Sequence, residues 1–136
     1  MKVLSQEEQR LCRVACDYAE KALPTYLQEY PESYLLREGI DVTRRFLAGD
    51  ATKEALLEIQ KDLDELVTVL EVKARQEDIS YAVAGAAMAA WFATKAATPS
   101  AEWPASWAAQ RAVWVSAWSL NVDPIVLLRQ AGLVRA

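Results

Sequence analysis

Residues 78–97 read DISYAVAGAAMAAWFATKAA, and this stretch decides the fold. Alanine falls on nearly every side of a helix drawn through it. The uncharged run from Ile79 to Thr94 is too short to span a bilayer, which needs about 20 strongly apolar residues. A helix that is apolar all round lies in the middle of a bundle, and small side chains let its neighbours approach closely. We therefore predict a central buried helix over about residues 78–97.

The segments on either side predict further helices, because their hydrophobic period is helical and no stretch alternates with a period of two. The expected helices and their end signals are 5–23 (capping box Ser5 and Glu8, ending before Pro24), 33–48 (or from Pro31, closed by Gly49), 53–76 (capped by Asp50 or Thr52), 104–120 (Pro104 first) and 123–132 (opened by Asp123 and Pro124). Gly39 inside the second helix predicts a kink or close packing. The expected fold class is all-α, an antiparallel bundle of five to six helices, with residues 1–136 forming a single helical domain.

The segment 53–76 combines an apolar seam with an acidic opposite face. The seam has heptad spacing and consists of Leu56, Ile59, Leu63, Leu66 and Leu70. We expect it to pack against the chain's own helices, with dimerisation as the alternative, so the chain is a monomer or a homodimer. The acids form either a solvated face or a docking stripe about 17 Å long at 1.5 Å per residue, and they are Glu54, Glu58, Asp62 and Glu65.

The chain contains no histidine, which excludes more chemistry than any motif present adds. Ser-His-Asp and Cys-His nucleophile systems are excluded, as are His-containing metal sites. The four glycines lie too far apart for a phosphate-binding loop. Cys12 and Cys16 are one helical turn apart, and we expect two buried structural thiols. The expectation is a protein that is not an enzyme and that has no cofactor and no metal site.

The charge pattern favours a basic protein as the partner. The net charge is −4; residues 1–78 carry 11 basic and 17 acidic side chains, and residues 79–136 carry 4 and 2. Such a chain repels phosphate backbones, so nucleic acid is not an expected partner. It attracts a basic protein surface and speeds its association. The N-terminal residues lack the apolar segment of a secretory signal, and we expect a cytoplasmic protein with no membrane partner.

All five tryptophans fall between residues 91 and 118. On the helix 104–120, Trp107, Trp114 and Trp118 share one face with Arg111, which fits a packed core, a partner interface rich in Trp and Arg, or a small-molecule pocket. Trp103 precedes Pro104 in a loop and is expected to be the most exposed of the five. The candidate partner-binding residues at this edge are Trp103, Trp107 and Arg111.

Three segments resemble one protein family. They are residues 10–24 (RLCRVACDYAEKALP), residues 36–52 (LREGIDVTRRFLAGDAT) and the alanine run at 82–97. Their order is similar to that of the immunity proteins found in bacterial polymorphic-toxin loci. Members often have tryptophan near the position of Phe46 and histidines in the alanine-rich helices, both of which are absent here.

The resemblance implies a non-catalytic antidote that binds a cognate toxin and masks its active surface. The charge of the chain would suit a basic toxin domain, such as a nuclease. The alternative that the residues leave open is a helical scaffold or adaptor without a toxin partner.

Overall fold

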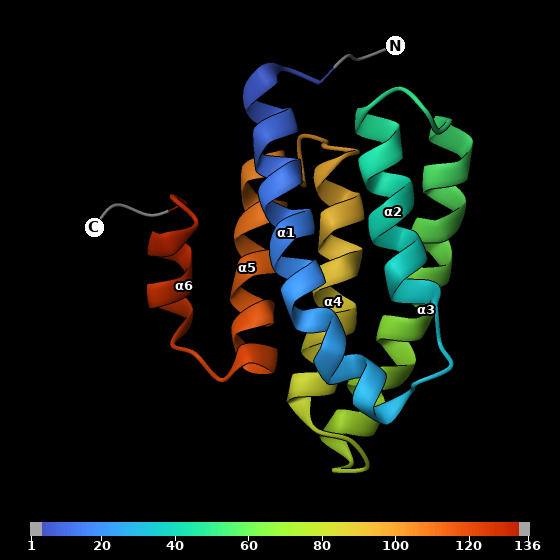
Figure 1. The fold of residues 1–136 in the computed structure, drawn as a ribbon, viewed down its shortest axis with the longest axis vertical. Coiled ribbons are helices and arrows are strands. Elements are labelled where there is room, and N and C mark those ends of the chain that lie inside the picture. The colour runs from blue at the N-terminus through green and yellow to red at the C-terminus, as the bar shows by residue number, and fades with distance from the viewer. Residues whose placement is uncertain (1–3, 134–136) are drawn as a thin grey trace.

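The computed structural model describes residues 4–133, whose regular structure consists of six helices. Their bounds are Gln6–Glu29 (α1), Leu35–Leu47 (α2), Lys53–Arg75 (α3), Tyr81–Ala96 (α4), Ala105–Leu120 (α5) and Pro124–Gln130 (α6). Successive helices run in opposite directions and are joined by short connections (Figure 1). The predicted all-α antiparallel bundle is confirmed.

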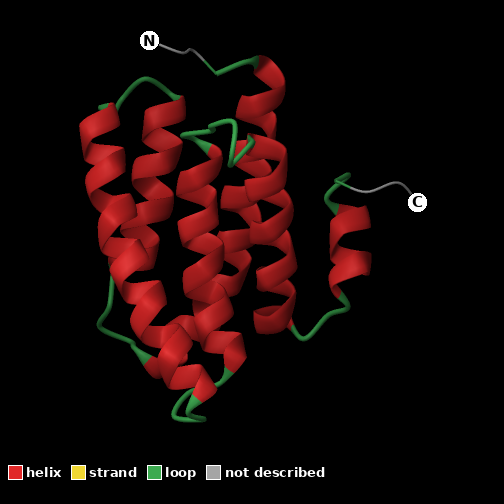
Figure 2. Ribbon diagram, turned by 180° about the vertical axis from the view of Figure 1, so that it is seen from behind, coloured by secondary structure: helices red, strands yellow, loops and turns green. Residues whose placement is uncertain are grey.

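The alanine-rich α4 is the centre of the bundle, as predicted. It contacts α1, α2, α3 and α5, and most of its residues are buried. Seen from both sides, α1 and α2 form one layer and α3, α4 and α5 form the other (Figures 1 and 2). The short α6 stands outside both layers; its backbone lies close to α5 alone, and its Leu127 and Leu128 share an apolar cluster with Tyr18 of α1. No helix within residues 4–133 has the length and apolar character needed to cross a membrane.

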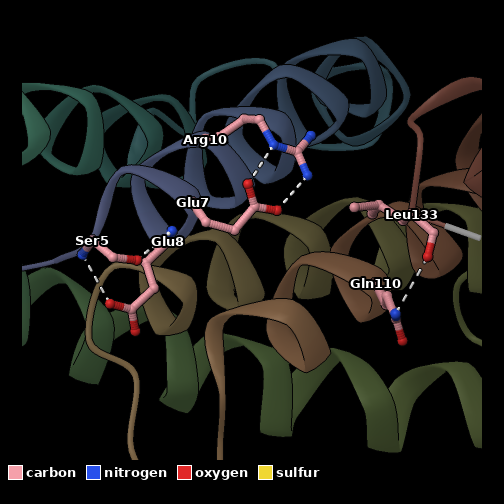
Figure 3. Close-up of polar contacts among 6 residues, drawn as sticks. All are labelled: Ser5, Glu7, Glu8, Arg10, Gln110 and Leu133. Atoms are coloured by element: carbon pink, nitrogen blue, oxygen red, sulfur yellow. Dashed lines mark hydrogen bonds and ion pairs between the residues drawn. The ribbon is translucent and has the colours of Figure 1, made fainter.

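Several helix ends follow from the side chains that the sequence places there. The Ser5 hydroxyl accepts from the Glu8 amide at 3.0 Å while the Ser5 amide donates to the Glu8 carboxylate at 2.9 Å (Figure 3). Thr52, rather than Asp50, caps α3 by accepting from the Ala55 amide, and Asp123 caps α6. These bonds satisfy amides that a helix start leaves without partners.

Gly49 closes α2 as the sequence predicts. Its φ is +83°, a left-handed value that glycine adopts at little cost. The Gly49 amide donates to the Phe46 carbonyl, and the next amide donates to the Arg45 carbonyl at 2.7 Å. This pair of bonds is the Schellman arrangement, which ends a helix by satisfying its last carbonyls.

The prediction that the first helix stops before Pro24 is wrong, because α1 continues through Pro24 to Glu29. Proline removes the bond to the carbonyl four residues earlier, which belongs to Glu20. Both residues lie on the exposed side of α1, so water can satisfy that carbonyl. Beyond the proline, the Thr25 hydroxyl donates to the Ser119 carbonyl at 3.1 Å, and Tyr26 is buried. These tertiary contacts hold the last turns in helical form.

The second helix starts at Leu35, later than either predicted start at Pro31 or Ser33. The Ser33 hydroxyl lies 3.0 Å from the Tyr26 hydroxyl and shares a hydrogen bond with it. That bond engages the hydroxyl of a residue expected to open the helix, and Tyr34 at the helix start makes no side-chain capping bond. The end of α1 therefore determines where α2 begins.

The seam of α3 packs inside the chain, against α2 and α4. Its buried positions depart from the heptad at one point, because Val67 is buried where Leu66 was expected and Leu66 is only partly buried. A straight helix has 3.6 residues per turn rather than 3.5, so its buried face drifts away from a strict seven-residue repeat. The buried row is Leu56, Ile59, Leu63, Val67, Leu70 and Ala74.

Gly85 and Gly39 both permit close contacts between helices, but of different kinds. A Cβ on Gly85 would lie 2.7 Å from the Val115 carbonyl oxygen and 3.2 Å from the Trp118 ring, so α4 touches the backbone of α5 there. A Cβ on Gly39 would lie 2.7 Å from the Leu63 side-chain terminus. Of the two predictions for Gly39, close packing is therefore the one that describes the structure.

Gly85→Ala should destabilise the protein by about 2 kcal/mol or more, because a backbone carbonyl cannot move aside without separating two helices. Gly39→Ala is the matched control. It should stay within about 1 kcal/mol of wild type, since the Leu63 methyl can shift and alanine favours the helix. Urea denaturation of the two variants measures both changes, and equal losses would contradict this account of the α4–α5 contact.

Candidate protein-binding surfaces

The four predicted acidic residues of α3 lie on one exposed face, which we call the acidic face and define as Glu54, Glu58, Asp62 and Glu65. This face is opposite the buried row, so it points away from the bundle. Within residues 4–133, no cation forms an ion pair with any of the four. Lys61 is exposed on the same side and forms no ion pair with any described residue. The acidic face is thus a run of uncompensated carboxylates.

The acidic face continues into an apolar end on the same helix. Val69 and Val72 follow Asp62 and Glu65 at helical spacing, and they are 51% and 45% exposed. Valine has a lower helix propensity than alanine or leucine, and an exposed valine side chain does not contribute the free energy that burial would give. The outward side of α3 is therefore acidic in its N-terminal part and apolar toward its C-terminus. Protein–protein interfaces combine such charged and apolar areas.

Aromatic side chains from both helices of the α4–α5 hairpin meet near the connection between them. The Trp103 ring centre is 4.4 Å from that of Trp107 and 5.5 Å from that of Trp91, in edge-to-face contacts. Phe92 lies 6.0 Å from both Trp103 and Trp107. We call these four residues, Trp91, Phe92, Trp103 and Trp107, the aromatic cluster. Each of the four is partly buried, so the cluster is neither fully buried in the core nor fully exposed to solvent.

The expectation that Trp103 is the most exposed tryptophan is wrong. Trp118 is the exposed one, at 38%, and its ring meets Tyr81 edge to face at 6.0 Å. Trp103 is covered because the antiparallel hairpin folds its loop back onto α4. Trp118 lies outward because Gly85 of α4 occupies the space beneath it.

The only charged residues of α4 and α5 both lie over tryptophan rings. The Lys95 amine is 5.3 Å from the Trp91 ring centre and 5.5 Å from that of Trp103, and the Arg111 guanidinium is 4.9 Å from that of Trp107. These distances are those of cation–π contacts. Neither cation pairs with a carboxylate in the part of the chain that the structure describes.

The structure brings together part of the predicted site and separates the rest. Trp103, Trp107 and Arg111 adjoin one another, whereas the acidic face lies on α3, which packs on α2 and α4 and not on α5. Sequence reasoning missed Trp91, Phe92 and Lys95 as members of the aromatic edge. The spacing gives no direct signal, since Phe92 stands five residues before the turn at 97–104 and Trp107 three residues after it.

Arg44 links α2 to α1 at the surface. Its guanidinium donates to Asp17 at 2.9 Å and to Glu20 at 2.6 Å. Partial burial alone would lower the pKa of Arg44, but the two carboxylates outweigh that effect and raise it. Arg45 makes an ion pair one turn back on α2, with Asp41 at 3.8 Å. These acids are therefore structural, in contrast to those of the acidic face.

Cys12 and Cys16 are both buried and form no disulfide. The Cys12 thiol lies 3.6 Å from the Ala93 carbonyl oxygen of α4 and donates to it. The neighbouring Cys16 thiol and burial both raise the pKa of Cys12 well above its ordinary value. The thiolate is the reactive form, so the raised pKa makes Cys12 unreactive. Both side chains are fully buried and belong to the packing between α1 and α4.

Comparisons of the chain with protein-family models, with curated proteins and with solved structures give no match.

Iodoacetamide should alkylate neither cysteine of the folded protein at a rate comparable with that of the unfolded chain. We expect the native reaction to be at least about 100-fold slower, because it requires opening of the α1–α4 contact. Raising the pH to alkaline values should not remove this difference, since the raised pKa of Cys12 keeps that thiol protonated. Mass spectrometry counts the adducts, and rapid native modification of Cys12 would show that the thiols are accessible.

Proposed function

We propose that this chain is a non-catalytic protein-binding domain that captures a basic surface of a partner protein and thereby masks it. The observation that carries the proposal is the acidic face of α3, where four exposed carboxylates have no ion pair among the described residues. Glu7, Asp17, Asp41 and Glu71 are each paired with an arginine, whereas the four acids of the acidic face stand together on one exposed side of a single helix.

Electrostatics supports a basic partner. Glu54 and Glu58, and then Glu58 and Asp62, stand one turn apart, and like charges at this spacing destabilise a helix by a few tenths of a kcal/mol per pair. A basic surface laid against them would relieve that repulsion and accelerate association. Val69 and Val72 would then supply apolar contact beside the charges.

The partner class follows from the resemblance of residues 10–97 to immunity proteins of bacterial toxin loci. An antidote that masks the active surface of a toxin needs binding and no chemistry of its own. A toxin that acts on nucleic acid carries a basic active surface, which the acidic face would complement. We therefore propose a basic toxin domain as the partner. The alternative is a scaffold or adaptor that uses the same acidic and apolar face for another basic protein.

The product of the neighbouring gene should be toxic when expressed alone, harmless when expressed with this chain, and recovered with it as a stoichiometric complex. Glu58→Lys, Asp62→Lys and Glu65→Lys together should weaken that complex by at least about 100-fold, since charge pairs at interfaces carry several kcal/mol of coupling. The side chains are exposed, so the variant should fold normally, which circular dichroism checks.

The matched control carries Glu29→Lys, Glu32→Lys and Glu38→Lys, which change the net charge equally on other exposed positions. It should rescue as wild type does. Equal loss in both triple variants would show that net charge, and not the acidic face, governs binding. A harmless neighbour that forms no complex would remove the antidote proposal and favour the scaffold.

A further inference from the structure

A hollow of about 310 Å³ lies between α5 and α6, on the opposite edge of the bundle from the acidic face. Its walls are Trp107, Gln110, Arg111, Trp114 and Leu128. It lies where α6, after leaving the bundle at Asn121, turns back beside α5, with Leu127 and Leu128 sharing an apolar cluster with Tyr18 of α1 (Figures 1 and 2). Its size is at the small end of the range for ligand sites, which are typically apolar with a few polar groups.

Arg111 is the charged group at this hollow, and its geometry leaves it free to bind an anion. Its guanidinium lies 4.9 Å from the centre of the Trp107 ring, which holds the cation without using any of its N–H groups. Within residues 4–133 it makes no hydrogen bond and no ion pair. A planar guanidinium fixed in this way presents a fork of donors that matches a carboxylate.

The remaining walls combine apolar surface with additional donors. Trp107, Trp114 and Leu128 offer indole and aliphatic faces. The indole nitrogens of both tryptophans make no hydrogen bond in the described part of the chain, and neither is a buried unsatisfied atom, so they are open to solvent. Gln110 donates to the Leu133 carbonyl at 3.5 Å, which ties the end of α6 to α5 (Figure 3) and leaves the amide oxygen of Gln110 free.

We propose that this hollow binds an amphiphilic carboxylate, with its apolar group between Trp107, Trp114 and Leu128 and its carboxylate on Arg111. A single cation without a second basic residue or a helix N-terminus suits a monoanion better than a phosphate. The volume suits an aryl group or one large side chain rather than a long lipid chain. The carboxylate belongs either to a free small acid or to the C-terminus of a peptide. This site is independent of the acidic face and of the partner proposed for it.

The test is titration of the full-length, ¹⁵N-labelled protein with 3-phenylpropanoate, followed through the indole N–H signals of Trp107 and Trp114. We expect saturable shifts of both signals with an affinity in about the millimolar range or tighter. The uncharged isostere 3-phenylpropanol should bind at least about tenfold more weakly, because it lacks the charge-assisted bond to Arg111. Arg111→Met should weaken the binding of 3-phenylpropanoate by the same factor, although its methionine side chain still covers Trp107 with apolar atoms.

Lys95→Met is the matched control, since it removes one cation from the same helical hairpin outside the hollow, and it should leave the affinity for 3-phenylpropanoate unchanged. A second arm uses the peptide Gly-Ser-Gly-Phe as free acid and as C-terminal amide. Binding of the free-acid peptide but not of the amide assigns the site to chain termini, and binding of 3-phenylpropanoate alone assigns it to small acids. Absence of shifts with both carboxylates, or equal affinity in Arg111→Met and wild type, would overturn the proposal.

Discussion

The close approach of α4 to α5 is the constraint on which the rest of this structure depends. At Gly85 there is no room for a methyl group, because a Cβ atom there would lie 2.7 Å from the Val115 carbonyl oxygen. The alanines along α4 extend this narrow contact over the length of the helix and leave room for α1, α2 and α3 around it. Each alanine buries little apolar area by itself, so stability comes from the number of helices in contact with α4.

The same narrow contact determines where the large side chains lie. Tryptophans cannot fit between two helices that meet through glycine and alanine, so they lie along the edges of the pair, with Trp118 on Gly85 and Trp107 at the far end. Trp91, Trp103 and Trp107 are therefore partly buried, and Lys95 and Arg111 lie over their rings. Meanwhile α3 packs on the far side of α4, which leaves its acids facing outward and away from the aromatic edge. The close α4–α5 contact thus leaves two chemically different surfaces, the aromatic edge and the acidic face.

Most of the fold could be predicted from the sequence, because local signals agree with the final packing. The alanine pattern of α4, the Ser5 capping box and the Gly49 closure each involve residues close in the chain. The prediction failed at Pro24, where the bond from Thr25 to the distant Ser119 and the burial of Tyr26 outweigh the effect of proline. The acidic face was predictable from helical spacing alone. The aromatic cluster and the α5–α6 hollow were not, since they depend on how the hairpin aligns Phe92 with Trp107 and on where α6 returns.

Hydrogen exchange of the backbone amides of the native protein tests the central role of the α4–α5 contact most directly. Amides that open only when the whole domain unfolds exchange slowest, and those held by a single neighbouring helix exchange earlier. We expect the slowest amides to lie in the middle of α4 and α5, and we expect α6, whose backbone lies close to α5 alone, to exchange fastest among the six helices. Protection of α6 or α3 equal to that of α4 would contradict it, because the bundle would then not depend on the alanine-rich helix.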